Sequence, residues 1–172
     1  MTQHNIATSR INRYLMVAIL LGLMIHGTAI FFTLEKTYDA LIHLFFGDHY
    51  ATSWFEPWNP KWYTGFTVMG YPPLVHQSIA LLSFVGGLKF GLYTVALIGV
   101  ILFTTGVYRY ALLLFDDQKI AGYAAIFAVV SSSFAETLHV FGQLPSIIGI
   151  SVLMHALPYI IIGLDRGIKS TF

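Results

Sequence analysis

The sequence predicts an all-α integral membrane protein: a helical bundle of four to five hydrophobic segments, with an amphipathic external helix and an aromatic-rich external loop. Of its 172 residues, 56% are hydrophobic and only 10% are charged, and the mean hydropathy is +0.72. Soluble domains, by contrast, carry about 25% charged residues. The apolar residues form long blocks without Asp, Glu, Lys or Arg, and about 20 apolar residues cross a bilayer core. These blocks are residues 14–34, 71–88, 90–108, 120–135 and 145–164.

Composition also excludes several kinds of site. The chain contains no cysteine, which excludes a disulfide framework, a thiolate nucleophile and a cysteine-based metal site. The net charge of +1 is not informative about nucleic acid, but no run of basic residues occurs, so we expect no nucleic-acid partner.

The basic residues predict the topology of a single membrane module, residues 1–172. Arg10 and Arg13 precede the first span (14–34), so the positive-inside rule places the N-terminus in the cytoplasm, at the plasma (inner) membrane. If every later block crosses, three of the nine Lys and Arg residues lie inside and six outside. If residues 71–88 are instead interfacial or re-entrant, six lie inside and three outside. The second arrangement is favoured, with an external loop at 35–70 and further spans at 90–115, 120–136 and 145–164.

The external loop opens with a short amphipathic helix, predicted over residues 37–46 (TYDALIHLFF). Thr37 is a candidate N-cap, and Asp39 lies in the first turn, where a negative charge suits the helix dipole. Gly47 is expected to end this helix. Asp39 and His43 are four residues apart and therefore share a face.

The aromatic-rich part of the loop runs over residues 54–77 (WFEPWNPKWYTGFTVMGYPPLVHQ) and holds all three tryptophans of the chain. Pro57, Pro60 and Gly65 favour turns over a regular helix. One interpretation of the aromatic residues is a membrane-interface belt. The other is an ordered loop that fixes its rings around Asp39 and His43, because a belt requires neither fixed turns nor carboxylates.

A second, shorter external segment covers residues 136–143. Glu136, His139 and Gln143 are spaced i, i+3 and i+7, which predicts one stripe of a helix beside the first loop. The histidines within apolar blocks are interpreted as uncharged side chains packed between helices, although intramembrane ionisable groups suggest function. They are His26, His76 and His155.

These motifs resemble the N-terminal part of bacterial and archaeal polytopic membrane proteins labelled "6-pyruvoyl-tetrahydropterin synthase-related", which are similar to C-type (GT-C) membrane glycosyltransferases. The resemblance covers residues 14–77, with a looser match at FGQLP (141–145). The matching positions are Asp39, His43, Trp58, Asn59, Pro60, Trp62, Tyr63, Gly65, Phe66, Tyr71, Pro72, Pro73 and Leu74.

The resemblance implies a site on the external face that uses a polyprenyl-phosphate-linked sugar. It implies that Asp39 is a general base or, with His43, a ligand of a divalent metal such as Mg or Mn. Glu136 is the candidate for a second catalytic acid. The expected substrate-binding residues are His43, Trp58, Trp62, Tyr63, Tyr71, His139 and Gln143.

Two functions from different classes follow. In the first, the chain is part or all of a C-type glycosyltransferase that uses a lipid-linked sugar. Catalytic C-type proteins are much longer than this chain, so we expect the missing part of such an enzyme to be supplied by further chain or by other membrane subunits. The alternative is a non-catalytic accessory subunit of a larger membrane complex, in which the aromatic loop docks other membrane subunits. In either case membrane lipid is a partner, and small residues in the apolar blocks suit packing against other helices.

Overall fold

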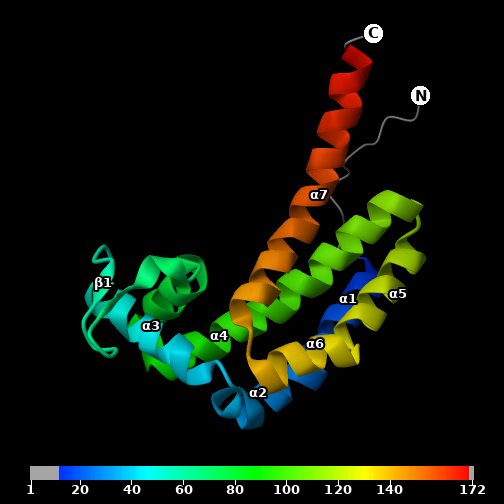
Figure 1. The fold of residues 1–172 in the computed structure, drawn as a ribbon. Helices are drawn as coiled ribbons and strands as arrows, with labels where there is room; N and C mark the ends of the chain where they lie inside the picture. The colour runs from blue at the N-terminus through cyan, green and yellow to red at the C-terminus, as the bar shows by residue number, and fades with distance from the viewer. Residues whose placement is uncertain (1–11, 171–172) are drawn as a thin grey trace.

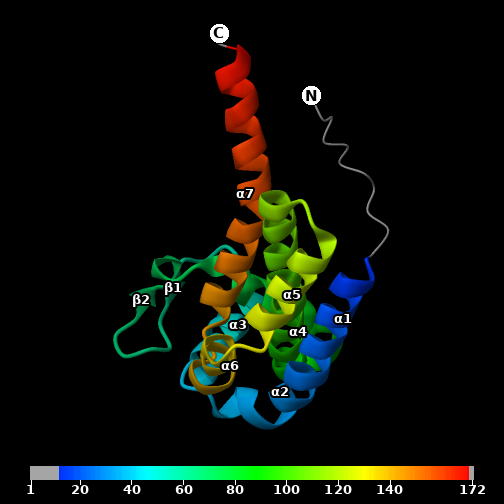
Figure 2. The ribbon, with the colours of Figure 1, turned by 90° about the vertical axis from the view of Figure 1, so that its right-hand side faces the viewer.

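The computed structural model describes residues 12–170, and the side chains of residues 12–164; Arg10, used above for topology, lies outside the described residues. The described chain is almost entirely helical (Figures 1 and 2). Three helices are long and apolar enough to cross a membrane, Arg13–Lys36, Pro73–Phe115 and Leu144–Leu164, and a fourth candidate is the bent pair Gln118–Val129 and Ser132–Phe141. The all-α helical fold class is therefore confirmed, and the three candidate spans are compatible with a membrane protein.

The elements follow the apolar blocks in order. The first long helix consists of α1 (Arg13–Gly22), the π-helical η1 (Leu23–Gly27), α2 (Thr28–Thr33) and η2 (Leu34–Lys36). The segment predicted to be external contains α3 (Ala40–Thr52), the short strands β1 (Trp58–Asn59) and β2 (Phe66–Thr67), and η3 (Val68–Gly70). The remainder is α4 (Pro73–Phe115), α5 (Gln118–Val129), α6 (Ser132–Glu136), the π-helical η4 (Thr137–Phe141) and α7 (Leu144–Ser170).

Helix α4 is not straight but folds back on itself at two glycines. Gly86 and Gly87 have non-helical backbone angles, and Gly87 has a φ of +83°, which suits a residue without Cβ. Gly91 then lies directly against the Ile79 backbone carbonyl, which twelve residues of straight helix would hold far apart. The first arm (73–86) is shorter than the roughly 20 residues that cross a bilayer core. A re-entrant or interfacial placement of this arm is compatible with that length.

The second arm of α4 (88–115) occupies the centre of the bundle, with α7 along one side and α1 and α5 along another (Figures 1 and 2). Small residues allow close approach of the helices. Gly99 lies under Ile147 and Ile148 of α7, and Gly122 of α5 lies against Tyr14 of α1. The core is apolar between these elements and includes Ile30, Val100, Val129, Leu138 and Ile147.

The charged side chains separate to the two ends of the bundle. Asn12 and Gln118 hydrogen bond at one end, where Lys119 lies over the Tyr123 ring and Arg13 over Tyr14. At the other end of the first long helix, Glu35 pairs with Lys89 at 2.6 Å. Lys89 therefore lies at the end that carries α3 and its loop, opposite to Lys119.

Helix α3 differs from the helix predicted over residues 37–46. Thr37 is not its N-cap: the Thr37 hydroxyl donates to the Leu34 carbonyl and ends the preceding helix instead. Gly47 does not end α3, which continues to Thr52. A Cβ at Gly47 would lie only 2.9 Å from Ile79 Cγ2, so glycine permits the close approach of α4 here. Gly47 therefore serves close packing against α4, and the prediction of a break there is wrong.

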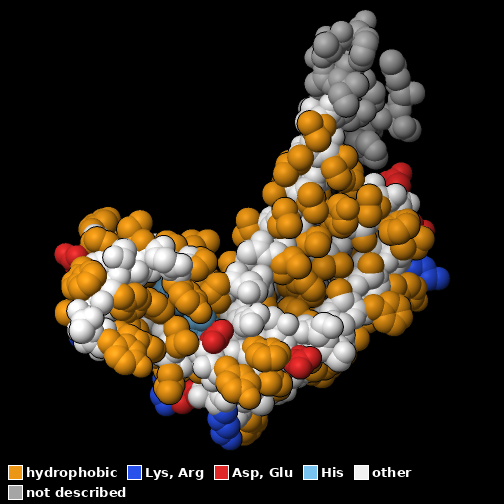
Figure 3. Space-filling view, in the orientation of Figure 1, with side chains coloured by type: hydrophobic (Ala, Val, Ile, Leu, Met, Phe, Trp, Pro, Cys, Tyr) orange, Lys and Arg blue, Asp and Glu red, His pale blue; other side chains and the backbone are white. Residues whose placement is uncertain are grey.

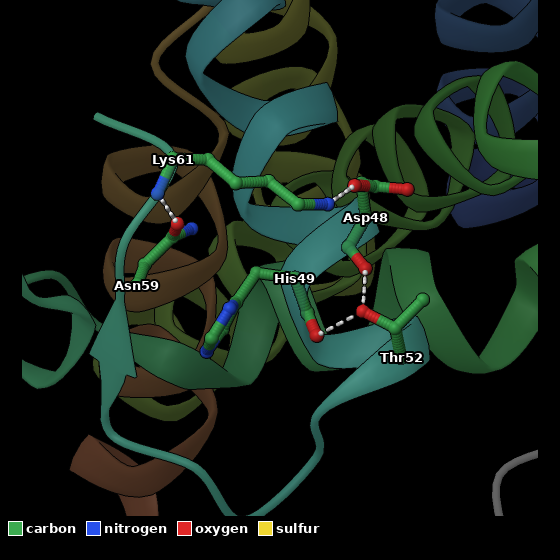
Figure 4. Close-up of polar contacts among 5 residues, drawn as sticks. All are labelled: Asp48, His49, Thr52, Asn59 and Lys61. Atoms are coloured by element: carbon green, nitrogen blue, oxygen red, sulfur yellow. Dashed lines mark hydrogen bonds and ion pairs between the residues drawn. The ribbon is translucent and has the colours of Figure 1, made fainter. Parts of the chain in front are cut away.

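The loop after α3 is folded onto that helix. The β1–β2 hairpin pairs Trp58 with Thr67, and Gly65 (φ +94°) leaves room for the Trp58 ring. Lys61 forms an ion pair of 2.9 Å with Asp48 of α3 and donates its backbone N–H to Asn59 (Figure 4). Rings of the loop, α3 and α4 then form an aromatic cluster of Phe45, Phe46, Trp62, Phe66, Tyr71 and His76.

We expect Lys89 to be external and Lys119 cytoplasmic, because Lys89 and Lys119 lie at opposite ends of the bundle. The re-entrant arrangement also places six of the nine Lys and Arg residues of the whole sequence on the cytoplasmic side. The chain has no native cysteine, so Lys89→Cys and Lys119→Cys each provide a single labelling site. In intact cells, a membrane-impermeant thiol reagent should label position 89 and leave position 119 unlabelled until the membrane is opened. Labelling of 119 with protection of 89 would contradict this topology.

Candidate functional site

Two segments that are about a hundred residues apart are joined by a clamp of three hydrogen bonds. The Tyr38 N–H donates to the Val140 carbonyl at 3.2 Å, and the Asp39 N–H donates to the Phe141 carbonyl at 3.0 Å. His43 Nε2–H donates to the Gly142 carbonyl at 2.8 Å. The start of α3 is thereby held against the end of η4, which places Asp39 beside the first residues of α7.

Gly142 makes this approach possible. Its φ is +69°, in the left-handed region that favours glycine. A Cβ at this position would lie within 2.7 Å of the Thr37 Cβ and still closer to its hydroxyl. The helix therefore ends at Phe141, and Gln143 turns away from it.

The end of this helix corrects one prediction. Glu136, His139 and Gln143 do not form a single stripe, because the 137–141 segment is π-helical and Gly142 breaks the helix before Gln143. Glu136 is exposed and does not line the pocket described below. His139 turns inward and hydrogen bonds His26 and Thr33. Only Gln143 of the three reaches the candidate site.

The clamp creates a polar pocket of about 260 Å³ between the start of α3, the start of α4 and the start of α7. In the space-filling view the molecule is hollowed between α7 and the region of α3 and the strands, with acidic surface at the edge of the hollow (Figure 3). Asp39, Tyr71 and Gln143, all predicted as site residues, line the pocket together. The remaining lining residues are Pro72, Pro145 and Ser146.

The Asp39 carboxylate makes no capping hydrogen bond at the start of α3. It occupies the N-cap position, yet its side chain accepts no capping hydrogen bond, and its φ and ψ are in the right-handed helical region. Asp117, at the start of α5, does cap its helix by accepting from the N–H groups of Lys119 and Ile120. Asp39 therefore does not cap α3 by a hydrogen bond, although a favourable interaction of its charge with the helix dipole needs no such bond. Its carboxylate is on the residue that lines the pocket.

Behind this pocket lies a buried pair of histidines. His43 Nδ1 is 3.0 Å from His76 Nε2, and His76 Nδ1 is 3.2 Å from the Pro72 carbonyl. Both side chains are fully buried, so His43 does not line the pocket as a substrate-binding residue would. Burial lowers the pKa of His43, while the Gly142 carbonyl and the negative charge of Asp39 oppose that shift. His43 thus ties Asp39, Gly142 and the start of α4 together.

The predicted metal set, Asp39 and His43, does not fit this geometry. Both ring nitrogens of His43 are already hydrogen bonded inside the protein, to Gly142 and to His76. Among the described residues, no group of three or more His, Asp and Glu side chains could hold a metal ion. The divalent metal remains a prediction from the resemblance, and the chemistry below does not depend on it.

The predicted aromatic contacts divide into two groups. Tyr71 lines the pocket, whereas Trp58, Trp62 and Tyr63 do not. Trp62 packs into the aromatic cluster, with its ring centroid 5.1 Å from that of Phe45, and Tyr63 points away with 94% of its side chain exposed. Phe46 of the same cluster is 5.2 Å from Tyr71. The loop therefore supports Tyr71 and does not itself surround Asp39.

An apolar groove of about 190 Å³ lies between the first arm of α4, its second arm and α7. The polar pocket and this groove both involve the N-terminal ends of α4 and α7, with Leu74 two residues after Pro72 and Ile148 two residues after Ser146. Sequence reasoning did not find this groove, since its lining residues have ordinary membrane-span composition. They are Leu74, Val75, Ser78, Val95, Ile98, Leu102, Ile148 and Val152.

Neither protein-family models, nor curated proteins, nor solved structures give a match to this chain.

Gly142→Ala should break the clamp, because alanine in the left-handed region costs about 1–2 kcal/mol and its Cβ would collide with Thr37. We expect a lower unfolding temperature in detergent, followed by intrinsic tryptophan fluorescence. Gly149→Ala is the matched control: Gly149 lies within α7 with no atom within 4 Å of an added Cβ, so it should be neutral or stabilising. Equal unfolding temperatures for Gly142→Ala and the unchanged protein would contradict the clamp.

Proposed function

We propose that the chain is a GT-C-like membrane glycosyltransferase module that uses a polyprenyl-phosphate-linked sugar at the external face. The observation that carries this proposal is that Asp39, Tyr71 and Gln143, from three distant segments, line one polar pocket. The remainder of an active site is supplied by other membrane subunits or by further chain. The external side is assigned from the division of basic residues, with the N-terminus in the cytoplasm of a plasma-membrane protein.

The chemistry assigned to Asp39 is that of a general base. The acceptor hydroxyl oxygen forms a bond to the anomeric carbon of the sugar, and the bond from that carbon to the phosphate oxygen breaks. Its electron pair leaves with the phosphate, and the acceptor proton passes to the Asp39 carboxylate. Tyr71 and Gln143 carry a hydroxyl and an amide, which can hydrogen bond sugar hydroxyls or phosphate oxygens as donors.

The apolar groove suits the lipid part of such a donor. Its lining is almost wholly apolar, with Ser78 as its one hydroxyl-bearing side chain, and that hydroxyl donates to the Leu74 carbonyl. A molecule with a polar head and an apolar tail could therefore place its head at Asp39 and its tail between α4 and α7. Burial of an isoprenoid there is favourable by about 25 cal/mol per Å² relative to water.

A second candidate function is that of a non-catalytic accessory subunit. The observation that favours it is the outer surface of the loop, where Phe55 and Tyr63 are almost fully exposed at 93% and 94%. Exposed aromatic side chains of this kind are enriched at the centres of protein interfaces. Glu136, the expected second acid, also lies outside the pocket, so this chain alone supplies one candidate carboxylate.

Asp39→Asn tests the two functions against each other. Asparagine keeps the shape but cannot accept the proton, so we expect transfer from a polyprenyl-phosphate sugar, by membranes containing the assembled protein, to fall by about 10²–10⁴-fold. The matched control is Asp48→Asn, which removes a carboxylate from the same helix but only breaks an exposed ion pair with Lys61 and should leave transfer nearly unchanged.

Expression and subunit composition are measured in parallel and should be equal in both variants. Normal transfer by the Asp39→Asn assembly would remove the enzyme assignment from this chain. If every assembly that contains the unchanged chain is inactive toward such donors, the accessory function is supported.

A further inference from the structure

A second pair of histidines lies inside the bundle, away from the pocket. His26 Nδ1 is 2.8 Å from His139 Nε2, and the two rings are nearly parallel at 16°. Each histidine belongs to a π-helical segment, His26 to η1 and His139 to η4. Such segments are rare and occur frequently at functional sites. Two of them meeting at one hydrogen bond indicate a site that the local helix geometry has been altered to form.

The inner end of this pair is fixed by the break between α5 and α6. Helix α5 ends at Val129, so the carbonyl of Val129 lacks the usual helical donor. His26 Nε2–H donates to that carbonyl at 2.7 Å. Since a carbonyl can only accept, His26 Nε2 must carry a hydrogen, and in the neutral ring Nδ1 must then accept from His139 Nε2–H.

The outer end of the pair can be satisfied in two ways. Thr33 Oγ1 is 2.8 Å from His139 Nδ1 and 2.9 Å from the Ala29 carbonyl, but it has only one hydrogen to donate. In the first arrangement the Thr33 hydroxyl donates to a neutral His139 Nδ1. In the second, a protonated His139 donates Nδ1–H to Thr33, whose hydroxyl turns to donate to Ala29. Every polar group of the pair keeps a partner in both arrangements.

We propose that His26, His139 and Thr33 form a proton-binding site within the membrane bundle. A hydronium ion at the external side transfers one proton to the lone pair of His139 Nδ1 and leaves as water. The Thr33 hydroxyl rotates toward Ala29, and the positive charge is shared across the hydrogen bond to His26. His26 is buried and His139 is only partly covered, so the proton enters at His139. The site does not depend on glycosyl transfer.

The surroundings of the pair are apolar and uncharged. Phe134 meets the edge of the His26 ring at 5.1 Å and stacks on Phe103. Charged groups on the adjoining elements are otherwise engaged or turned outward: Glu35 and Lys89 pair with each other, and Arg109 bonds His155 and Tyr159. Lys36 and Glu136 are exposed, and Lys119 lies at the opposite end of α5. Asp39 is bonded to Phe141 through its backbone, and it lines the polar pocket. No described carboxylate hydrogen bonds either ring, so a proton bound by the pair has no ion-pair partner among the described residues.

Substitution of Thr33 separates proton binding from a purely structural pair. Thr33→Val keeps the shape of the side chain but removes the hydroxyl, so protonated His139 loses its acceptor. Because a hydrogen bond to a charged group contributes more than one to a neutral group, the proton affinity should fall by about tenfold or more. Thr33→Ser restores the hydroxyl and should keep the affinity of the unchanged protein.

The measurement is nitrogen NMR of the full-length protein in lipid nanodiscs, with ¹⁵N-histidine labelling, over a pH range around the ordinary histidine value of about 6.5. The His139→Gln variant assigns the resonances. We expect His26 and His139 to respond together to one proton, with the transition moved to lower pH in Thr33→Val and unmoved in Thr33→Ser. Signals from His43 and His76 serve as the internal control and should not change with either substitution.

Two results would overturn the proposal. One is that both rings keep fixed neutral tautomers throughout the titration. The other is that Thr33→Val binds the proton as tightly as Thr33→Ser.

Discussion

The arrangement of α3 and the start of α7 depends on the clamp between the segment at residues 37–43 and the end of η4. Its three hydrogen bonds run from consecutive acceptors, Val140, Phe141 and Gly142, to a segment with no regular structure at its start. Buried backbone groups without partners are costly, so each bond also satisfies a group that a membrane-side loop would otherwise leave unpaired. Gly142 permits the close approach of the two segments, and Asp39 and Gln143 therefore line the same pocket.

The fold could be predicted from the sequence as far as the apolar blocks reach. Spans need long uncharged runs, and the runs are visible without a structure. The structural role of each glycine is harder to predict from the sequence. Gly86 and Gly87 do break a helix, whereas Gly47 lies inside one because Ile79 packs against it. The same residue type serves chain reversal and close packing, and only the neighbour in space distinguishes them, so the end of α3 was misplaced.

For the site, the sequence predicts the pocket residues Asp39, Tyr71 and Gln143 more successfully than it predicts the positions of the other aromatic residues in the loop. Asp39, Tyr71 and Gln143 were identified, and they converge; Trp58, Trp62 and Tyr63 were identified from the same motif, and they do not line the pocket. A proline- and glycine-rich loop reveals that rings are fixed but not which way they face. Here Trp62 packs against Phe45 and Phe66, which support Phe46 and through it Tyr71. Trp62 therefore supports the pocket residue Tyr71 indirectly, through the rings packed between them.

Four of the seven described carboxylates have hydrogen-bond or ion-pair partners within the protein. Glu35 bonds Lys89 and Tyr93, Asp48 pairs with Lys61, and Asp117 caps α5. Glu56 accepts from the backbone N–H of Trp58 within its own turn. The side chains of Asp39, Asp116 and Glu136 have no such partner within the described part of the chain, and of these three only Asp39 lines the polar pocket. The backbone of Asp39 is held on both sides, by Phe141 and by His43. A carboxylate whose position is fixed through its backbone, with its oxygens left to a polar pocket, is arranged to meet something that enters from outside.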